Sequence, residues 1–235
     1  MEQHSPNFNS RGGEKISLLV LHYTGMKSAQ EAIERLCKAE AKVSAHYVVD
    51  EDGTVTALVD EADCAWHAGV SFWRGKRNVN PISIGVEIVN PGHEWGYRAF
   101  PQKQMEAVAK LCKGIVLRHH IAARDVVAHS DIAPQRKEDP GELFDWQWLA
   151  GQGVGLWPEV RVQSPESGSQ KKDVSKMQTQ LTEYGYETPQ NGIFDEATRK
   201  VAIAFQRHFR PNNIQGQWDN ECAGLLAALL ASAGH

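Results

Sequence analysis

Hydrophobic positions in the first two thirds of the chain follow the patterns of buried strands. Residues 16–23 are almost continuously apolar, as in a central strand that is covered on both faces. Residues 82–89 carry isoleucine or valine at every second position, which predicts a strand with one apolar face. Residues 125–129 predict another short strand, and residues 43–59 predict a hairpin that turns at an Asp-Gly pair.

Segments with helical periodicity lie between these strands. Residues 28–40 place Ile33 and Leu36 on one helical face, with Ser28 as the expected N-cap. Residues 102–120 repeat the same period. The alternation predicts an α/β fold in which helices flank a mixed central β-sheet.

The last third of the chain has a different pattern. Residues 160–173 are polar, rich in Ser and Gln, and lack apolar periodicity, which predicts a linker. Three short amphipathic helices are expected after it, the second beginning after Asp195 as N-cap. We therefore expect a first domain over residues 1–159, a linker over 160–173, and a small C-terminal three-helix domain over 174–235 that is large enough to fold alone.

The composition of the chain argues against several classes of protein. The chain has 235 residues, 41% of them hydrophobic, which excludes wholesale disorder. Its formal net charge of -4 argues against a nucleic-acid partner. No apolar run approaches the roughly 18 residues of a transmembrane helix. The four cysteines are scattered and are predicted to be buried thiols rather than disulfides or metal ligands.

Two histidines stand where predicted strands end. His22 ends the strand over 16–23, and His129 ends the strand over 125–129. Ligands gather at the carboxyl ends of strands in open α/β sheets, so these two side chains are expected to converge. Asp139 follows in the loop "HSDIAPQRKEDPG", and two imidazoles with a carboxylate suit Zn²⁺. The alternative is that each histidine is a structural residue and that Asp139 caps a helix or forms a turn.

Two further charged residues could take part in chemistry. Glu87 interrupts an apolar strand beside Gly85, a location suited to a general base. Lys137 lies two residues before Asp139, where its ammonium group could stabilise an oxyanion. The alternatives are an edge carboxylate and a solvated lysine.

Three residues form a polar and aromatic set in the segments "SAHYVV" and "CAWHAG". His46, Trp66 and His67 could line the cleft, with Trp66 stacking on a sugar or a peptide face. Packing and local hydrogen bonding are the alternative for all three.

Five motifs together resemble a known family. "VLHYTG", "VSAHYVVDEDGTV", "AWHAG", "SIGVEIVN" and "AHSDIAPQRKEDPG" occur in this order. The domain resembles the zinc-dependent N-acetylmuramoyl-L-alanine amidases, a superfamily that includes peptidoglycan recognition proteins and amidase-type phage lysozymes. The resemblance implies His22, His129 and Asp139 as zinc ligands, Glu87 as the acid/base residue and Lys137 as the oxyanion stabiliser. Non-catalytic recognition proteins typically lack part of this metal set.

The tail resembles a peptidoglycan-binding module of three helices, through a stretch that begins "MQTQLTEYGYETPQNGIF". The resemblance implies hydrolysis of the amide between the lactyl group of N-acetylmuramic acid and L-alanine, with peptidoglycan or muropeptide fragments as partners. Three alternatives stay open: a recycling amidase for soluble anhydro-muropeptides, a non-catalytic peptidoglycan-binding protein, and a zinc peptidase that cuts within the peptide.

The sequence leaves the compartment open. The wall-binding tail favours the cell envelope or periplasm. The N-terminal segment lacks the apolar core of a secretory signal, so a cytoplasmic location also stays open.

Overall fold

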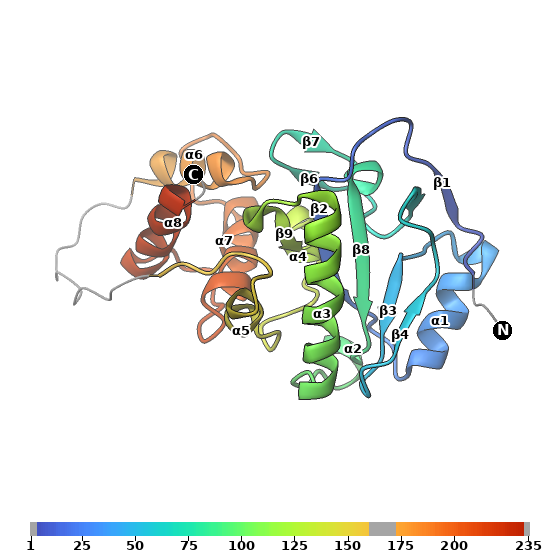
Figure 1. The fold of residues 1–235 in the computed structure, drawn as a ribbon. Helices are drawn as coiled ribbons and strands as arrows, with labels where there is room; N and C mark the ends of the chain where they lie inside the picture. Colours follow the sequence, from blue (N-terminus) through green and yellow to red (C-terminus); the bar gives the residue numbers. More distant parts are fainter. Residues whose placement is uncertain (1–3, 160–172, 233–235) are drawn as a thin grey trace.

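A five-stranded mixed sheet forms the centre of the first part of the molecule (Figure 1). The computed structural model describes residues 4–159 and 173–232. The strand order is β4-β3-β8-β2-β9. Strands β2, β3, β8 and β9 run parallel to one another, and β4 pairs antiparallel with β3. The strands are β2 (Leu18–Tyr23), β3 (Tyr47–Val49), β4 (Val55–Ala57), β8 (Ser83–Ile88) and β9 (Val126–Ala128).

Helix α3 (Gln102–His119) lies along one face of the sheet (Figure 1). The alternate apolar residues of β8, including Ile84 and Ile88, pack with Val108 and Cys112 of this helix. This confirms the face predicted from the period of two. Glu87 and Gly85 consequently belong to the other face of β8, the face that carries the site.

Short elements connect the sheet to its surroundings. The remaining helices of this part are α1 (Ala29–Cys37), α2 (Gly92–Trp95), α4 (His129–Ile132) and α5 (Trp146–Gly151), with 3-10 turns η1 (Ala39–Ala41), η2 (Asn80–Ile82) and η3 (Ala123–Asp125). As predicted, the Ser28 hydroxyl caps α1 by accepting from the Glu31 backbone N–H. Two small antiparallel ribbons pair β1 (Phe8–Ser10) with β5 (Asp63–Ala65) and β6 (Phe72–Trp73) with β7 (Lys76–Arg77). Their strands are too short for a periodic pattern to reveal them.

One boundary differs from the expectation. His129 was expected to end a strand, but β9 ends at Ala128 and His129 is the first residue of α4. The Asp131 carboxylate accepts from the Ala128 backbone N–H, which favours a helical turn at this point.

Three helices form the C-terminal part: α6 (Val174–Tyr184), α7 (Glu196–Phe209) and α8 (Asn220–Ser232). Asp195 caps α7 as expected, by accepting from the Thr198 backbone N–H. The apolar residues of these helices are buried together with Val20, Trp73 and Ile132 of the first part. The two parts therefore share buried surface. The expected linker falls almost wholly on residues 160–172, which lie outside the described residues.

The cysteines and the hydropathy of the helices agree with the sequence reading. All four cysteines are free thiols, and Cys64, Cys112 and Cys222 are buried as predicted, whereas Cys37 is only partly buried. In the part of the chain that the structure describes, none of the helices combines the length and the apolar character that crossing a membrane requires.

Candidate metal centre

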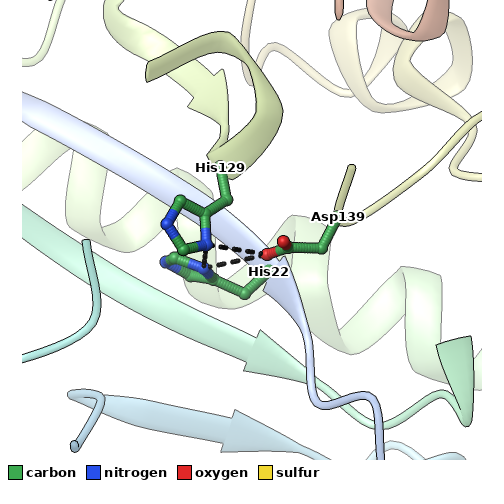
Figure 2. Close-up of side chains that lie close together, drawn as sticks. All are labelled: His22, His129 and Asp139. Atoms are coloured by element: carbon green, nitrogen blue, oxygen red, sulfur yellow. Dashed lines mark hydrogen bonds and ion pairs between the residues drawn. The ribbon is translucent and has the colours of Figure 1, made fainter. Parts of the chain in front are cut away.

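Three side chains that are distant in sequence meet at one point (Figure 2). His22 belongs to β2, His129 begins α4, and Asp139 lies in the loop after α4. The Nδ1 atoms of the two histidines are 2.9 Å apart. Asp139 Oδ2 lies 3.1 Å from His22 Nδ1 and 3.0 Å from His129 Nδ1. The convergence predicted from the strand ends is therefore present, and all three residues are buried.

The outward nitrogen of each histidine has a partner that orients the ring. His129 Nε2–H donates to the backbone carbonyl of Ala68 at 3.1 Å. His22 Nε2 lies 3.0 Å from His67 Nδ1, and His67 Nε2 lies 3.0 Å from the Ser83 hydroxyl. When each ring carries its proton on Nε2, the two Nδ1 lone pairs both face Asp139. Such outer partners fix the tautomer and orientation of metal-binding histidines.

Gly85 makes room for this arrangement. A Cβ atom on Gly85 would lie 2.4 Å from Cγ of the His67 ring. A glycine within a strand often marks a position where a ligand or another backbone approaches closely. The structure shows that the approaching group is the ring of His67, whose Nδ1 atom contacts Nε2 of His22.

The protonation states at the site suit a cation. Burial, and then the neighbouring His129, lower the pKa of His22 to about 4, so its ring is neutral at pH 7. Burial opposes ionisation of Asp139, but His129 and His22 hold the pKa of its carboxyl well below the usual range. A neutral His22 imidazole and an ionised Asp139 carboxylate are forms in which these side chains bind Zn²⁺. The residues present therefore fit this ion.

Glu87 lies directly beside the three residues. It is the register partner of His22 on the neighbouring strand β8, so the two side chains leave the same face of the sheet. Its Oε2 atom is buried and has no hydrogen-bond partner among the described residues. Burial, and then the charge of Asp139, raise the pKa of Glu87 well above its ordinary value, while Lys137 acts in the opposite direction. A carboxyl group whose pKa is raised in this way suits general acid/base chemistry.

Lys137 is half-buried in the turn that follows α4. Its backbone N–H donates to the Ala133 carbonyl at 3.0 Å, which fixes the turn. Its ammonium group lies close enough to lower the pKa of both Glu87 and His22. The site therefore has a cation on the loop that also supplies Asp139.

The remaining three predicted residues have different surroundings. His46 and His67 are buried, and His46 Nδ1 accepts from the Gly85 backbone N–H at 2.9 Å. Trp66 is half-buried, and its indole N–H donates to Asn9 at 2.6 Å. For the two histidines these positions favour packing and local hydrogen bonding over a place on the cleft wall. Substrate contact by Trp66 stays a prediction.

Sequence reasoning missed the residues that support the site. Neither Ser83 nor Asp131 was predicted as a site residue. A short polar side chain on the inward face of a strand is the only signal that could have marked Ser83. No local signal could have marked Asp131, because one of its partners, His208, is 77 positions away.

Comparison with known proteins agrees with this geometry. Residues 12–142, more than half of the chain, match the family model described as N-acetylmuramoyl-L-alanine amidase. The chain belongs to this amidase family. It therefore shares the family of the enzyme AmiD of Escherichia coli K12, to which it is 38% identical over 94% of this chain and 84% of that protein.

Solved structures of amidases have the same fold over nearly the whole chain. A complex of Escherichia coli AmiD with anhydro-N-acetylmuramic acid-L-Ala-D-γ-Glu-L-Lys is 35% identical, with a TM-score of 0.84 over 98% of this chain and 93% of that one. AmpDh3 of Pseudomonas aeruginosa, in complex with anhydromuramic pentapeptide, is 30% identical, with a TM-score of 0.81 over 97% of this chain and 95% of that one. The similarity thus includes the C-terminal helices.

The C-terminal part has its own match within this amidase. Residues 170–226 match the family model of a peptidoglycan binding domain. The resemblance found in the tail sequence is therefore confirmed, and the amidase carries a module of the kind that occurs in a cell-wall context.

Proposed function

We propose that this protein hydrolyses the amide bond between the lactyl group of N-acetylmuramic acid and L-alanine of the peptidoglycan stem peptide, with Zn²⁺ held by His22, His129 and Asp139. The observation that carries the proposal is the meeting of these three buried ligands, within 4.8 Å of one another, on the amidase fold. The solved AmiD relative binds a ligand that contains this bond between muramic acid and L-alanine.

Each residue of the site has a separate role in the proposed reaction. When bound, zinc supplies Lewis acidity at the scissile carbonyl and lowers the pKa of the attacking water. Glu87 takes the proton of that water and passes it to the leaving amine, which its raised pKa permits. Lys137 places a positive charge where the carbonyl oxygen becomes negative. The buried outer partners of His22 and His129 keep both rings in place throughout.

Two substrates agree with the structure. The peptidoglycan binding domain favours polymeric wall material, because a soluble fragment needs no anchor. The ligands of the AmiD and AmpDh3 structures favour anhydro-muropeptides as a second candidate. We propose that the wall polymer is the main substrate, and that the protein acts in the cell envelope or periplasm.

Digestion of intact sacculi and of purified anhydro-muropeptides, in parallel and with mass spectrometry of the products, tests this proposal. We expect stem peptides with L-alanine at the free amino end from both. Peptides cut at an internal bond would instead identify a peptidase. Cleavage of the soluble fragments alone would identify a recycling enzyme. No cleavage of either substrate by zinc-loaded protein would contradict the proposed activity.

A further inference from the structure

The C-terminal helix α7 lies against the segment that supplies two of the three proposed metal ligands. Residues 129–142 begin with His129 and contain Asp139, and we refer to them as the ligand loop. Lys200 of α7 donates to the Gln135 carbonyl at 3.1 Å, and Gln135 donates to the Ala197 carbonyl at 3.0 Å. Ile132 of the ligand loop is buried in one apolar cluster with Phe205 of α7. The contact is therefore a packed interface.

A fully buried carboxylate sits at the centre of this interface. Asp131 is 0% exposed and lies two residues after His129. Its Oδ1 accepts from the Tyr186 hydroxyl at 2.7 Å, and its Oδ2 accepts from His208 Nδ1 at 2.6 Å. Oδ2 also accepts from the Ala128 backbone N–H at 2.8 Å. Both side-chain donors thus come from the C-terminal part, and the backbone donor immediately precedes the metal ligand.

Breaking this hydrogen-bond network would carry a large free-energy cost. A buried carboxylate is strongly unfavourable without hydrogen-bond donors. Removing the donors from the C-terminal part would leave Asp131 with the Ala128 N–H alone. Asp131 would then turn toward water, and the first turn of α4, which holds His129, would move with it. The His208 ring is further fixed by stacking on Trp146, with ring centroids 3.9 Å apart.

Arg207, the residue of α7 that precedes His208, acts at the other end of the ligand loop. Arg207 Nη2 lies 3.0 Å from Glu138 Oε2, and Glu138 immediately precedes Asp139. Arg207 Nε lies 3.5 Å from Glu142, three residues after Asp139. Two consecutive residues of one helix therefore hold the neighbours of both ligands that the loop supplies.

We propose that α7 and the turn before it position the metal site: His208 and Tyr186 hold His129 through Asp131, and Arg207 holds Asp139 through Glu138. The peptidoglycan binding domain thus has a second role, as the supporting wall of the catalytic centre. Tyr186, Arg207 and His208 are positioning residues that touch neither metal nor substrate. The inference rests on the zinc site of the proposed function.

Full-length variants test the proposal through the metal itself. His208→Leu removes one donor to Asp131, and His208→Asn restores one, because the Asn amide nitrogen can occupy the place of Nδ1. Tyr186→Phe removes a single hydroxyl. Zinc affinity is measured by competition with a chelating dye, and ligand geometry by the visible absorption of the Co²⁺-substituted protein.

We expect His208→Leu to weaken zinc binding about tenfold or more, the range found when partners of metal ligands are removed. Its Co²⁺ spectrum should change, and kcat on a soluble muropeptide should fall more than KM rises. Tyr186→Phe should shift both metal readouts in the same direction by a smaller amount. His208→Asn should regain most of the affinity and the native spectrum, which a merely structural loss would not show.

Arg77→Ala is the matched control. Arg77 of β7 pairs with Glu187 of the C-terminal part at 2.6 Å, so this contact joins the same two parts but lies outside the ligand loop. We expect native zinc affinity and a native Co²⁺ spectrum. A loss equal to that of His208→Leu would overturn the proposal, because any weakening of the interface would then suffice.

The remaining outcomes are distinct. If His208→Leu and Tyr186→Phe bind zinc with native affinity and spectrum, the positioning role is overturned while the proposed function stands. If His208→Leu does not fold, Tyr186→Phe decides by the same two readouts. If the unmodified protein binds no zinc, the proposed metal site fails first and this inference fails with it.

Discussion

At the scale of single residues, the chemistry depends on which nitrogen of each histidine faces the site. Both histidines present Nδ1 to Asp139 and use Nε2 to contact the protein, His22 through His67 and His129 through Ala68. The sequence supplied the identity of the three proposed ligands, because His22 and His129 end predicted strands and Asp139 follows in the next loop. It could not supply the ring orientation, which depends on a buried histidine and a carbonyl from a distant loop.

Gly85 offers a test of the support behind His22. In Gly85→Ala the new Cβ would meet the His67 ring at 2.4 Å, so His67 must move and release His22 Nε2. We expect zinc affinity to fall about tenfold or more, as when other partners of metal ligands are lost. Competition titration with a chelating dye measures this. Gly53→Ala is a useful comparison, since Gly53 has a positive φ of 89° and a Cβ there would lie 3.0 Å from the Lys103 carbonyl oxygen, but it lies in the β3–β4 turn. Unchanged affinity in Gly85→Ala would show that His67 does not orient His22.

Glu87 is predicted to act on protons alone. Glu87→Ala should retain zinc, because the three proposed ligands are untouched, and should reduce kcat by a factor on the order of 10² or more. Steady-state kinetics together with metal analysis separate the two effects. Full activity in this variant would contradict the assignment of Glu87 as the acid/base residue.

At the scale of elements, the agreement between sequence and structure depends on length. The six-residue strands β2 and β8 and the 18-residue helix α3 have patterns long enough to read, and all were predicted. The ribbons β1–β5 and β6–β7 consist of strands of two or three residues, in which no period can be recognised. The equally short strands β3, β4 and β9 were predicted because they lie within the longer patterned segments 43–59 and 125–129. The ribbons matter because β5 leads directly into His67 and Ala68, the supports of the two histidines.

The Glu61 carboxylate accepts hydrogen bonds from separate elements, and its lowered pKa predicts that the stability of the fold depends on pH. Burial alone would raise its pKa, but hydrogen bonds from Arg118, His119 and Tyr47 lower the pKa to about 2 from 4.5. A carboxyl with a lowered folded-state pKa stabilises the fold above its unfolded pKa, and this contribution is lost as pH falls toward 2. Glu61→Gln should therefore cost on the order of 1 kcal/mol at pH 7, and the difference from the unmodified protein should shrink between about pH 4.5 and pH 2.

Urea unfolding of the metal-free protein at a series of pH values measures this difference. Glu51→Gln is the control, because Glu51 pairs with the exposed Arg98 and such pairs contribute little. A Glu61→Gln effect that stays constant across the pH range would contradict the prediction.

At the scale of the whole molecule, the largest difference from the sequence reading is how the C-terminal helices attach. The sequence predicted three helices, because each helix has its own apolar face, and the resemblance of the tail implied their binding class. It did not predict that Tyr186 and His208 would meet Asp131. Contacts between two units leave no periodic trace in either unit, so nothing local marks them.

Removal of zinc should lower the stability of the whole protein. A ligand that binds only the folded state stabilises it, and the gain grows with the logarithm of the ratio of free ligand concentration to dissociation constant, so EDTA should lower the melting temperature and abolish activity. Added zinc should restore both. Asp139→Ala, which lacks one proposed ligand, should melt at the same temperature with and without EDTA. An unmodified protein whose melting is equally insensitive to EDTA would contradict a bound metal.

The parallel pairing of β2 with β8 and β9 has a consequence for the order of events during folding. His22 and His129 are 107 positions apart, and they meet only after β2 has paired with β9. Bringing these ligands together in an unfolded chain costs loop-closure entropy, and the pairing of β2 with β9 removes that cost before the metal binds. In a zinc finger, metal binding drives the folding of the chain. Here the sheet must form first, so zinc added before or after refolding should leave the rate of sheet formation unchanged, and the metal arrives as the last component.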